Sequence, residues 1–161
     1  MTADVGKPLV AVIATGGTIA SRKDASGAAQ PVLRGQDLLD LLPPLDLRLR
    51  AVELPAKDSS ALTLADMQAI SDAVGAALAD PAVAGVVVLH GTDAMEETAL
   101  LIALQHGARG PVVLTGAQFS ADSDRPDGPG NLADALRAVL AGPAGVRLAF
   151  GGRLLPVWGL Y

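Results

Sequence analysis

The chain has 161 residues, of which 50% are hydrophobic and 2% aromatic, so we expect one domain over residues 1–161 with an aliphatic core. The net charge of −5 argues against binding to nucleic acid or to an anionic membrane surface, both of which attract basic proteins. The absence of cysteine excludes disulfides, thiolate chemistry and cysteine-based metal sites. The two histidines, His90 and His106, match no metal-ligand spacing, so we expect no metal.

The first half of the chain alternates between strand and helix patterns. A β-rich apolar run predicts a buried strand over 7–14, and the polar stretch 21–30 is typical of a mobile loop. A short helix is predicted over 35–42, followed by a half-exposed edge strand over 47–54. A helix over 63–79 then opens with a capping-box-like Thr-x-x-Asp pair.

The second half of the chain continues this alternation and adds one more loop. Its predicted elements, in order, are a strand over 85–89, a helix over 94–106, a strand over 111–115, a loop over 121–130, a helix over 131–140 and a strand over 146–150. No secretory signal and no apolar run long enough to cross a membrane is recognisable, so we expect a cytoplasmic protein.

Regular alternation of apolar strands with helices predicts an α/β fold. We expect a doubly wound, mostly parallel sheet with helices on both faces, in a Rossmann-like arrangement. With right-handed crossovers and strand order 2-1-3-4-5, the first and third strands are neighbours at the switch point, where ligands bind. The loops that follow these two strands should therefore face each other across one crevice.

The first of these loops contains two glycines and a threonine. Gly16 and Gly17 allow a sharp turn and a close approach to a ligand, and Thr18 offers a nucleophile or a hydrogen bond. A phosphate-binding loop is a weak alternative, because the lysine of that motif is absent. A plain turn between a strand and a loop is the other alternative.

The second of these loops reads His90–Thr98 and includes Thr92 and Asp93. A hydroxyl beside a carboxylate suggests attack on a carbonyl or amide group, but a Thr-Asp step can also simply cap a helix. His90 is more often a packed strand-end residue than a catalytic one. The acidic pair after Met95 more often compensates the helix dipole than forms a pair of facing carboxylates.

Taken together, the motifs resemble those of the bacterial-type L-asparaginases over nearly the whole chain. Four segments carry the resemblance: Thr15–Ala20, His90–Ala99, Thr115–Gln118 and Asp127–Leu132. The segment Asp58–Thr63 adds a weaker match.

The resemblance implies a fold, a reaction and a set of residues. It implies an asparaginase N-terminal domain in which Thr18 attacks the side-chain amide of L-asparagine, releasing ammonia and then aspartate without a cofactor. Thr92 would help transfer protons, and Asp93 would hold the α-amino group. Backbone N–H groups near Thr92 and Ala117 would face the oxyanion. The implied binding residues are Gly17, Ser59, Ser60, Gly91, Thr92, Asp93 and Ala117.

Three departures from the family pattern stand beside this resemblance. The loop over 21–30 has no tyrosine, and Ala29 stands roughly where the family carries one; the single tyrosine is Tyr161. The family's lysine would follow Tyr161, and neither Lys57 nor Lys23 matches it. The family's smaller C-terminal domain is not in this sequence. The very apolar segment 154–161 should pack against another copy in a homo-oligomer or precede further chain.

Two other functions stay open on the sequence. The first is hydrolysis of glutamine or of another amide, since one methylene in a pocket changes binding by only about 1–3 kcal/mol. The second is a non-catalytic domain that binds asparagine or aspartate. The missing tyrosine and lysine favour the second, whereas the presence of Thr18, Thr92 and Asp93 disfavours it.

Overall fold

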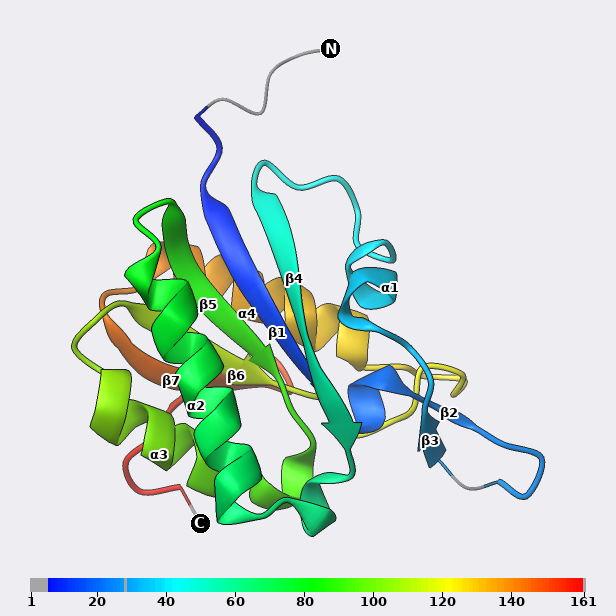
Figure 1. Ribbon diagram of the computed structural model, residues 1–161. Helices are drawn as coiled ribbons and strands as arrows, with labels where there is room; N and C mark the ends of the chain where they lie inside the picture. The colour runs from blue at the N-terminus through cyan, green and yellow to red at the C-terminus, as the bar shows by residue number, and fades with distance from the viewer. Residues whose placement is uncertain (1–5, 28, 161) are drawn as a thin grey trace.

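A six-stranded sheet forms the centre of the computed structural model, which describes residues 6–27 and 29–160 (Figure 1). Five of its strands are parallel, and the sixth, β8, pairs with β7 in the antiparallel sense. In spatial order the strands are β4 (Arg48–Lys57), β1 (Leu9–Gly16), β5 (Val83–Leu89), β6 (Pro111–Thr115), β7 (Gly145–Phe150) and β8 (Arg153–Pro156). The predicted order 2-1-3-4-5 is confirmed for the five parallel strands.

Helices cover both faces of the sheet, as predicted (Figure 1). One face packs against α1 (Gly35–Leu39) and α4 (Gly128–Ala141), and the other packs against α2 (Leu64–Ala79) and α3 (Met95–His106). Successive side chains of a strand point to opposite faces, so Val12 lies in the first core and Ile13 in the second. Both are fully buried, which explains why the central strands are continuously apolar.

Local sequence signals set the ends of the helices. The Thr63 side chain accepts a hydrogen bond from Asp66 N (3.2 Å), and Asp66 Oδ2 accepts one from Thr63 N (2.9 Å), so the predicted capping box of α2 is present. Helix α4 begins at Gly128, three residues before the predicted start, because Pro129 fits the first helical turn.

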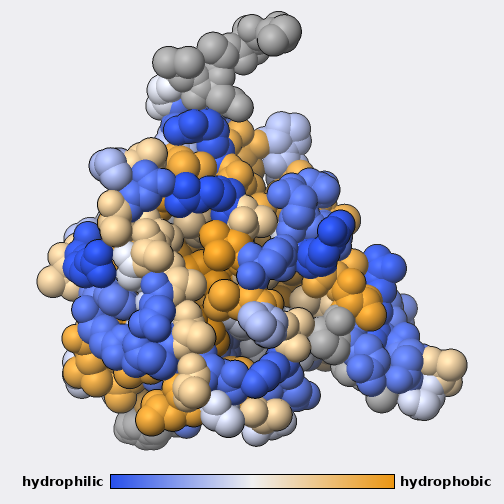
Figure 2. All heavy atoms as spheres, viewed as in Figure 1, coloured by the Kyte–Doolittle hydropathy of each residue, from blue (hydrophilic) through white to orange (hydrophobic). Residues whose placement is uncertain are grey.

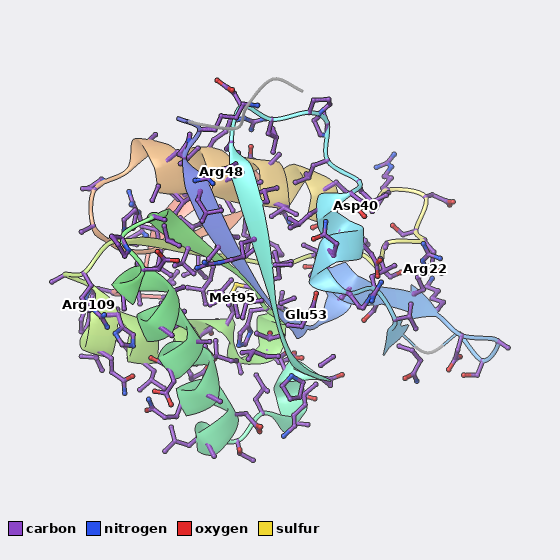
Figure 3. The ribbon with its side chains drawn as sticks, turned by 45° about the horizontal axis from the view of Figure 1, so that its top comes forward. Arg22, Asp40, Arg48, Glu53, Met95 and Arg109 are labelled. Carbon is purple, nitrogen blue, oxygen red and sulfur yellow. The ribbon has the colours of Figure 1, made fainter. Side chains whose placement is uncertain are left out.

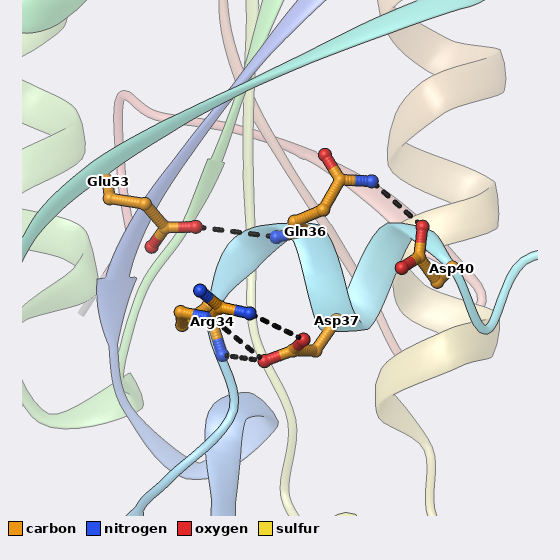
Figure 4. A network of polar contacts seen from close by, with 5 residues as sticks. All are labelled: Arg34, Gln36, Asp37, Asp40 and Glu53. Atoms are coloured by element: carbon orange, nitrogen blue, oxygen red, sulfur yellow. Dashed lines mark hydrogen bonds and ion pairs between the residues drawn. The ribbon is translucent and has the colours of Figure 1, made fainter.

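Helix α1 is shorter than predicted and is fixed to the neighbouring strand by polar contacts. It ends at Leu39, and Glu53 of β4 accepts a hydrogen bond from Gln36 N at 3.3 Å (Figure 4). Asp37 accepts from Arg34 N at 2.8 Å, and this bond and the Arg34 guanidinium lower the pKa of its carboxyl group. Figure 3 shows Arg48 and Glu53 at successive points along β4.

The prediction of a loop over 21–30 was wrong. Strands β2 (Ser21–Lys23) and β3 (Ala29–Pro31) form an antiparallel hairpin that projects from the body of the protein (Figure 1). Its base is tied to a segment distant in sequence, because Ala121 N donates to Ser21 O and Lys23 N to Asp122 Oδ2, each at 3.0 Å. These bonds depend on tertiary structure and have no local signal.

The last described segment forms the additional strand β8 and a turn. Val157 is buried in the second core, whereas the side chains of Leu154 and Trp158 are 49% and 67% exposed. Strand pairing within the chain therefore accounts for part of the apolar character of this segment. Its packing against another copy or further chain stays a prediction. None of the helices in the described ranges is long and apolar enough to cross a bilayer.

Candidate active site

The loops after β1, β4 and β5 converge at the carboxyl edge of the sheet and enclose a small polar cavity. Its volume is about 60 Å³, enough for a few water molecules or the polar end of a small ligand. The residues that line it are Gly17, Thr18, Ser21, Lys57, Asp58, Ser59, Gly91 and Asp93. Five of these eight residues belong to the predicted site, and they come from three separate loops.

Two glycines allow the three loops to touch. Gly17 has φ of +80°, and a Cβ atom there would lie 2.6 Å from the Gly91 nitrogen. A Cβ atom at Gly91 would in turn lie 2.7 Å from the Ser59 Cβ. Any larger residue at either position would push the loops apart, so both glycines are required by the close approach of the backbone.

Ser59 and Asp93 form a reciprocal pair on the wall of the cavity. Ser59 is 4% exposed, and its Oγ donates to Asp93 Oδ2 and accepts from Asp93 N, each at 3.1 Å. These two bonds fix the carboxylate of an otherwise exposed residue. The other oxygen, Oδ1, makes no hydrogen bond to another described residue and is therefore available to a ligand.

Thr18 lines the same cavity, in the 3₁₀ turn Thr18–Ala20 that follows β1. The residue is half-buried, and its hydroxyl makes no hydrogen bond to another residue in the described ranges. The backbone around it is held, because Gly17 O accepts from Ser21 Oγ (2.8 Å) and from Ala20 N (3.1 Å). A fixed loop thus presents a hydroxyl that has no structural bond of its own.

Thr92 and Asp93 are not helix caps, so that alternative was wrong. They lie in a separate 3₁₀ turn, Thr92–Ala94, and the N-cap of α3 is Ala94, which makes no side-chain capping bond. Thr92 itself is exposed and does not line the cavity, although it lies between two residues that do. The structure therefore places Thr92 beside the cavity and Asp93 in its wall.

Two further predicted residues also lie outside the cavity lining. Ser60 donates from its backbone N (2.9 Å) and its Oγ (2.7 Å) to Asp58 Oδ1, and these bonds lower the pKa of the Asp58 carboxyl group. Ala117 is buried and does not line the cavity. Its neighbour Gly116 packs against His90 O, so close that no side chain would fit there.

His90 occupies a packed position at the end of β5, which is the more common role of a histidine at a strand end. It is fully buried, its Nδ1 lies 2.6 Å from Gly91 O, and burial lowers its pKa. A neutral imidazole in this position shapes the β5 loop and does not reach the cavity. Across the described ranges, no three His, Cys, Asp or Glu residues are grouped closely enough to hold a metal ion.

Three residues of the cavity lining, Ser21, Lys57 and Asp58, were not among the site residues predicted from the sequence. Lys57 Nζ lies 2.6 Å from Asp66 Oδ1, and this bond, together with bonds from Thr63, lowers the pKa of Asp66 to about 2. Lys57 follows the predicted second strand, at the edge where ligands bind, and that position was the available signal.

Comparisons with known proteins agree with this architecture. Residues 9–160 match the family profile described as "Asparaginase, N-terminal". The chain is 40% identical over 134 residues to a glutamyl-tRNA(Gln) amidotransferase component of Pyrobaculum aerophilum, covering 82% of the chain and 32% of that protein. It is 33% identical over 135 residues to probable L-asparaginase 1 of Schizosaccharomyces pombe, covering 80% and 38%.

A solved structure contains the fold of this chain in about half of its length. The probable cytoplasmic L-asparaginase of Campylobacter jejuni superposes with a TM-score of 0.85 at 29% identity, covering 96% of this chain and 48% of that one. The chain thus spans about a third of the length of these curated relatives and about half of that structure.

Proposed function

Because the chain belongs to the asparaginase family, we propose that it carries the nucleophile pocket of an amidohydrolase that converts L-asparagine to L-aspartate and ammonia. The observation that supports this most is the convergence of two groups on one cavity: Thr18, whose hydroxyl makes no hydrogen bond to another described residue, and Asp93, with a fixed carboxylate. A nucleophile and an anion in the lining of one cavity suit a small substrate that has an amide at one end and an ammonium at the other.

In the proposed reaction, Thr18 Oγ attacks the carbon of the side-chain amide. The C–N bond breaks, the hydroxyl proton ends on the departing nitrogen, and ammonia leaves an ester on Thr18. Water then attacks the same carbon, which restores the Thr18 hydroxyl and releases aspartate. Thr92 would assist the proton transfers from beside the cavity, and the backbone N–H groups of Thr92 and Ala117 would stabilise the oxyanion.

The substrate would be held by its charged end. Asp93 would bind the α-ammonium group through Oδ1, because Oδ2 is already bonded to Ser59. Ser59 would fix that carboxylate and, where its hydroxyl turns from Asp93 to the ligand, would contribute to binding of the α-carboxylate. Ser60, Gly17 and Gly91 would shape the loops around the ligand. No cofactor takes part in this proposal.

Removing the proposed nucleophile tests the function. In Thr18→Ala, ammonia release from L-asparagine should fall by about 10³-fold or more, whereas Thr18→Ser should keep measurable activity. The readout is ammonia release by the purified protein, with circular dichroism to show that the fold is intact. Ammonia release that persists in Thr18→Ala would contradict this role. Tight aspartate binding without ammonia release by the unaltered protein would instead favour a binding domain.

A second candidate function is suggested by the amidotransferase relative, whose identity to this chain is higher than that of the asparaginase from Schizosaccharomyces pombe. On this alternative the same pocket releases ammonia from an amide, glutamine included, for transfer to another substrate. Turnover of asparagine and of glutamine, measured side by side, distinguishes the two. A preference for glutamine would favour this second candidate.

We also propose that the protein acts in the cytoplasm as a homo-oligomer. The exposed Trp158 and Leu154 beside β8 supply an apolar surface that a second copy of the chain could cover. The structural neighbour from Campylobacter jejuni is described as cytoplasmic. Sedimentation analysis of the purified protein tests the oligomer, and a monomer at all concentrations would contradict it.

A further inference from the structure

We propose that Lys57 determines substrate specificity by binding the carboxylate of the amino-acid amide in the cavity described above. This inference rests on the proposed function and adds a residue to it. Among the described residues that line the cavity, Lys57 has the positive charge, and Asp58 and Asp93 have the negative ones. A free amino acid, which carries both charges, would complement Lys57 and Asp93 together.

A distortion of β4 brings Lys57 to the cavity. Ala14 of β1 pairs with Glu53, but Gly16 pairs with Lys57, so β4 contains extra residues at this point, including Pro55. Such a bulge bends a strand and redirects its side chains. Gly16 has φ of +96°, and a Cβ there would lie 3.1 Å from the Lys57 backbone nitrogen. The two backbones therefore meet only because position 16 is glycine.

Asp66 pairs with Lys57 without using all of the donors of its ammonium group. An ammonium has three N–H donors, and Lys57 gives one of them to Asp66 Oδ1. The Lys57 side chain is 44% exposed, so the protein does not enclose the remaining donors. Lys57 also lines a second cavity of about 80 Å³, whose lining includes Asp66 and Ile70.

The remaining polar groups of the cavity are less suited to a carboxylate. Ser59 Oγ already donates to Asp93, and Asp58 would repel a second anion. Lys57 offers a charge-assisted hydrogen bond, which is roughly twice as strong as a neutral one. Lys57 is thus the group best placed to distinguish free asparagine from an uncharged amide or from asparagine within a peptide.

The test compares asparagine with its α-methylamide, in which a neutral group replaces the carboxylate. In Lys57→Met, KM for asparagine should rise about 10- to 100-fold with little change in kcat, and turnover of the methylamide should hardly change. Lys57→Arg should restore most of the preference for asparagine. An unchanged preference in Lys57→Met would overturn the proposal.

Asp66→Asn is the matched control, because it breaks the same ion pair and leaves the cation in place. Asp66→Asn should keep the preference for the carboxylate. If Asp66→Asn and Lys57→Met lose the preference for the carboxylate equally, the ion pair only supports the fold, and the proposal is overturned. Aspartate binding, measured by calorimetry, separates this proposal from the proposed function. Weaker binding in Lys57→Met supports the role of Lys57 even where the unaltered protein releases no ammonia, and equal binding overturns it.

Discussion

The loops after β1 and after β6 end at the same edge of the sheet but use their polar side chains differently. After β6, Asp127 accepts hydrogen bonds from Gln118 N and Phe119 N, each at 2.9 Å. Asn131 donates to Gly116 O at 2.9 Å and accepts from Gly151 N at 3.1 Å. After β1, in contrast, Thr18 presents a hydroxyl that bonds to no other described residue.

This contrast teaches that residue type alone does not identify a functional polar group. Thr15 and Thr115, near the ends of β1 and β6, are buried and donate to Leu89 O (2.8 Å) and Ala149 O (2.6 Å). Their hydroxyls join neighbouring strands, whereas the hydroxyl of Thr18 is left for a ligand. The difference is whether the hydroxyl already donates a hydrogen bond to a backbone carbonyl.

The largest expected effect would separate the loops of the cavity. Gly17→Ala should lower the free energy of unfolding by about 2–4 kcal/mol and abolish most ammonia release, because its Cβ would collide with Gly91 and its φ suits only glycine. Urea unfolding and an ammonia assay measure the two effects. Gly27 is the control, since it also has positive φ (+84°) but no atom lies within 4 Å of a Cβ there. Similar losses in Gly17→Ala and Gly27→Ala would contradict the requirement for close contact.

A medium effect is expected from the β6 side of the comparison. Asn131→Ala should destabilise the fold by about 2–3 kcal/mol, because Gly116 O and Gly151 N would lose a buried partner. Where the protein is still folded, ammonia release should change less than in Gly17→Ala. Thermal unfolding and the ammonia assay measure both, and the control is Asp134→Ala on the same helix, which removes a half-buried side chain that pairs with Arg137. Full inactivation of folded Asn131→Ala would remove the distinction between the two loops.

The smallest expected effect concerns pH and Asp66. Hydrogen bonds from Lys57 and Thr63 lower the pKa of Asp66 from 3.8 to about 2. A carboxyl group with a lowered pKa in the folded state stabilises the protein above about pH 4, and this stabilisation is lost as the pH falls toward 2. The unaltered protein should therefore lose its stability advantage over Asp66→Asn across that range. Urea unfolding at a series of pH values measures the difference, and a constant difference would contradict this pKa.

The elements predicted well from the sequence were those with long apolar runs. The predicted strand over 111–115 has the same bounds as β6, and the last four of its five residues are buried. The β2–β3 hairpin and β8 escaped prediction because their stability depends on partners outside their own segments. The hairpin needs Asp122, about a hundred residues away, and β8 needs the exposed edge of β7.

The cavity shows the same division between local and distant signals. Gly17, Thr18 and Asp93 could be selected from short motifs, because each motif directly follows an apolar run that predicts a buried strand. For Lys57 the only signal was its position after the second predicted strand, because its place in the cavity depends on a bulge in β4 and on the pairing of that strand with β1. The Ser59–Asp93 pair likewise joins two loops 34 residues apart.

The two edge strands of the sheet differ in how open they are to pairing with a strand of another molecule. At one margin of the sheet, the antiparallel strand β8 follows the parallel strands. At the other margin, the ten-residue β4 presents its outer backbone edge. A groove lined partly by Val52 and Ala73 lies beside it, and apolar atoms are visible there (Figure 2). An edge of this kind invites a strand from another molecule to add to it. The exposed Arg48 and Arg50 discourage such addition by charge, and Pro55 interrupts the row of donors. Arg48, Arg50 and Pro55 are thus features of β4 that disfavour strand addition at the margin nearest the cavity.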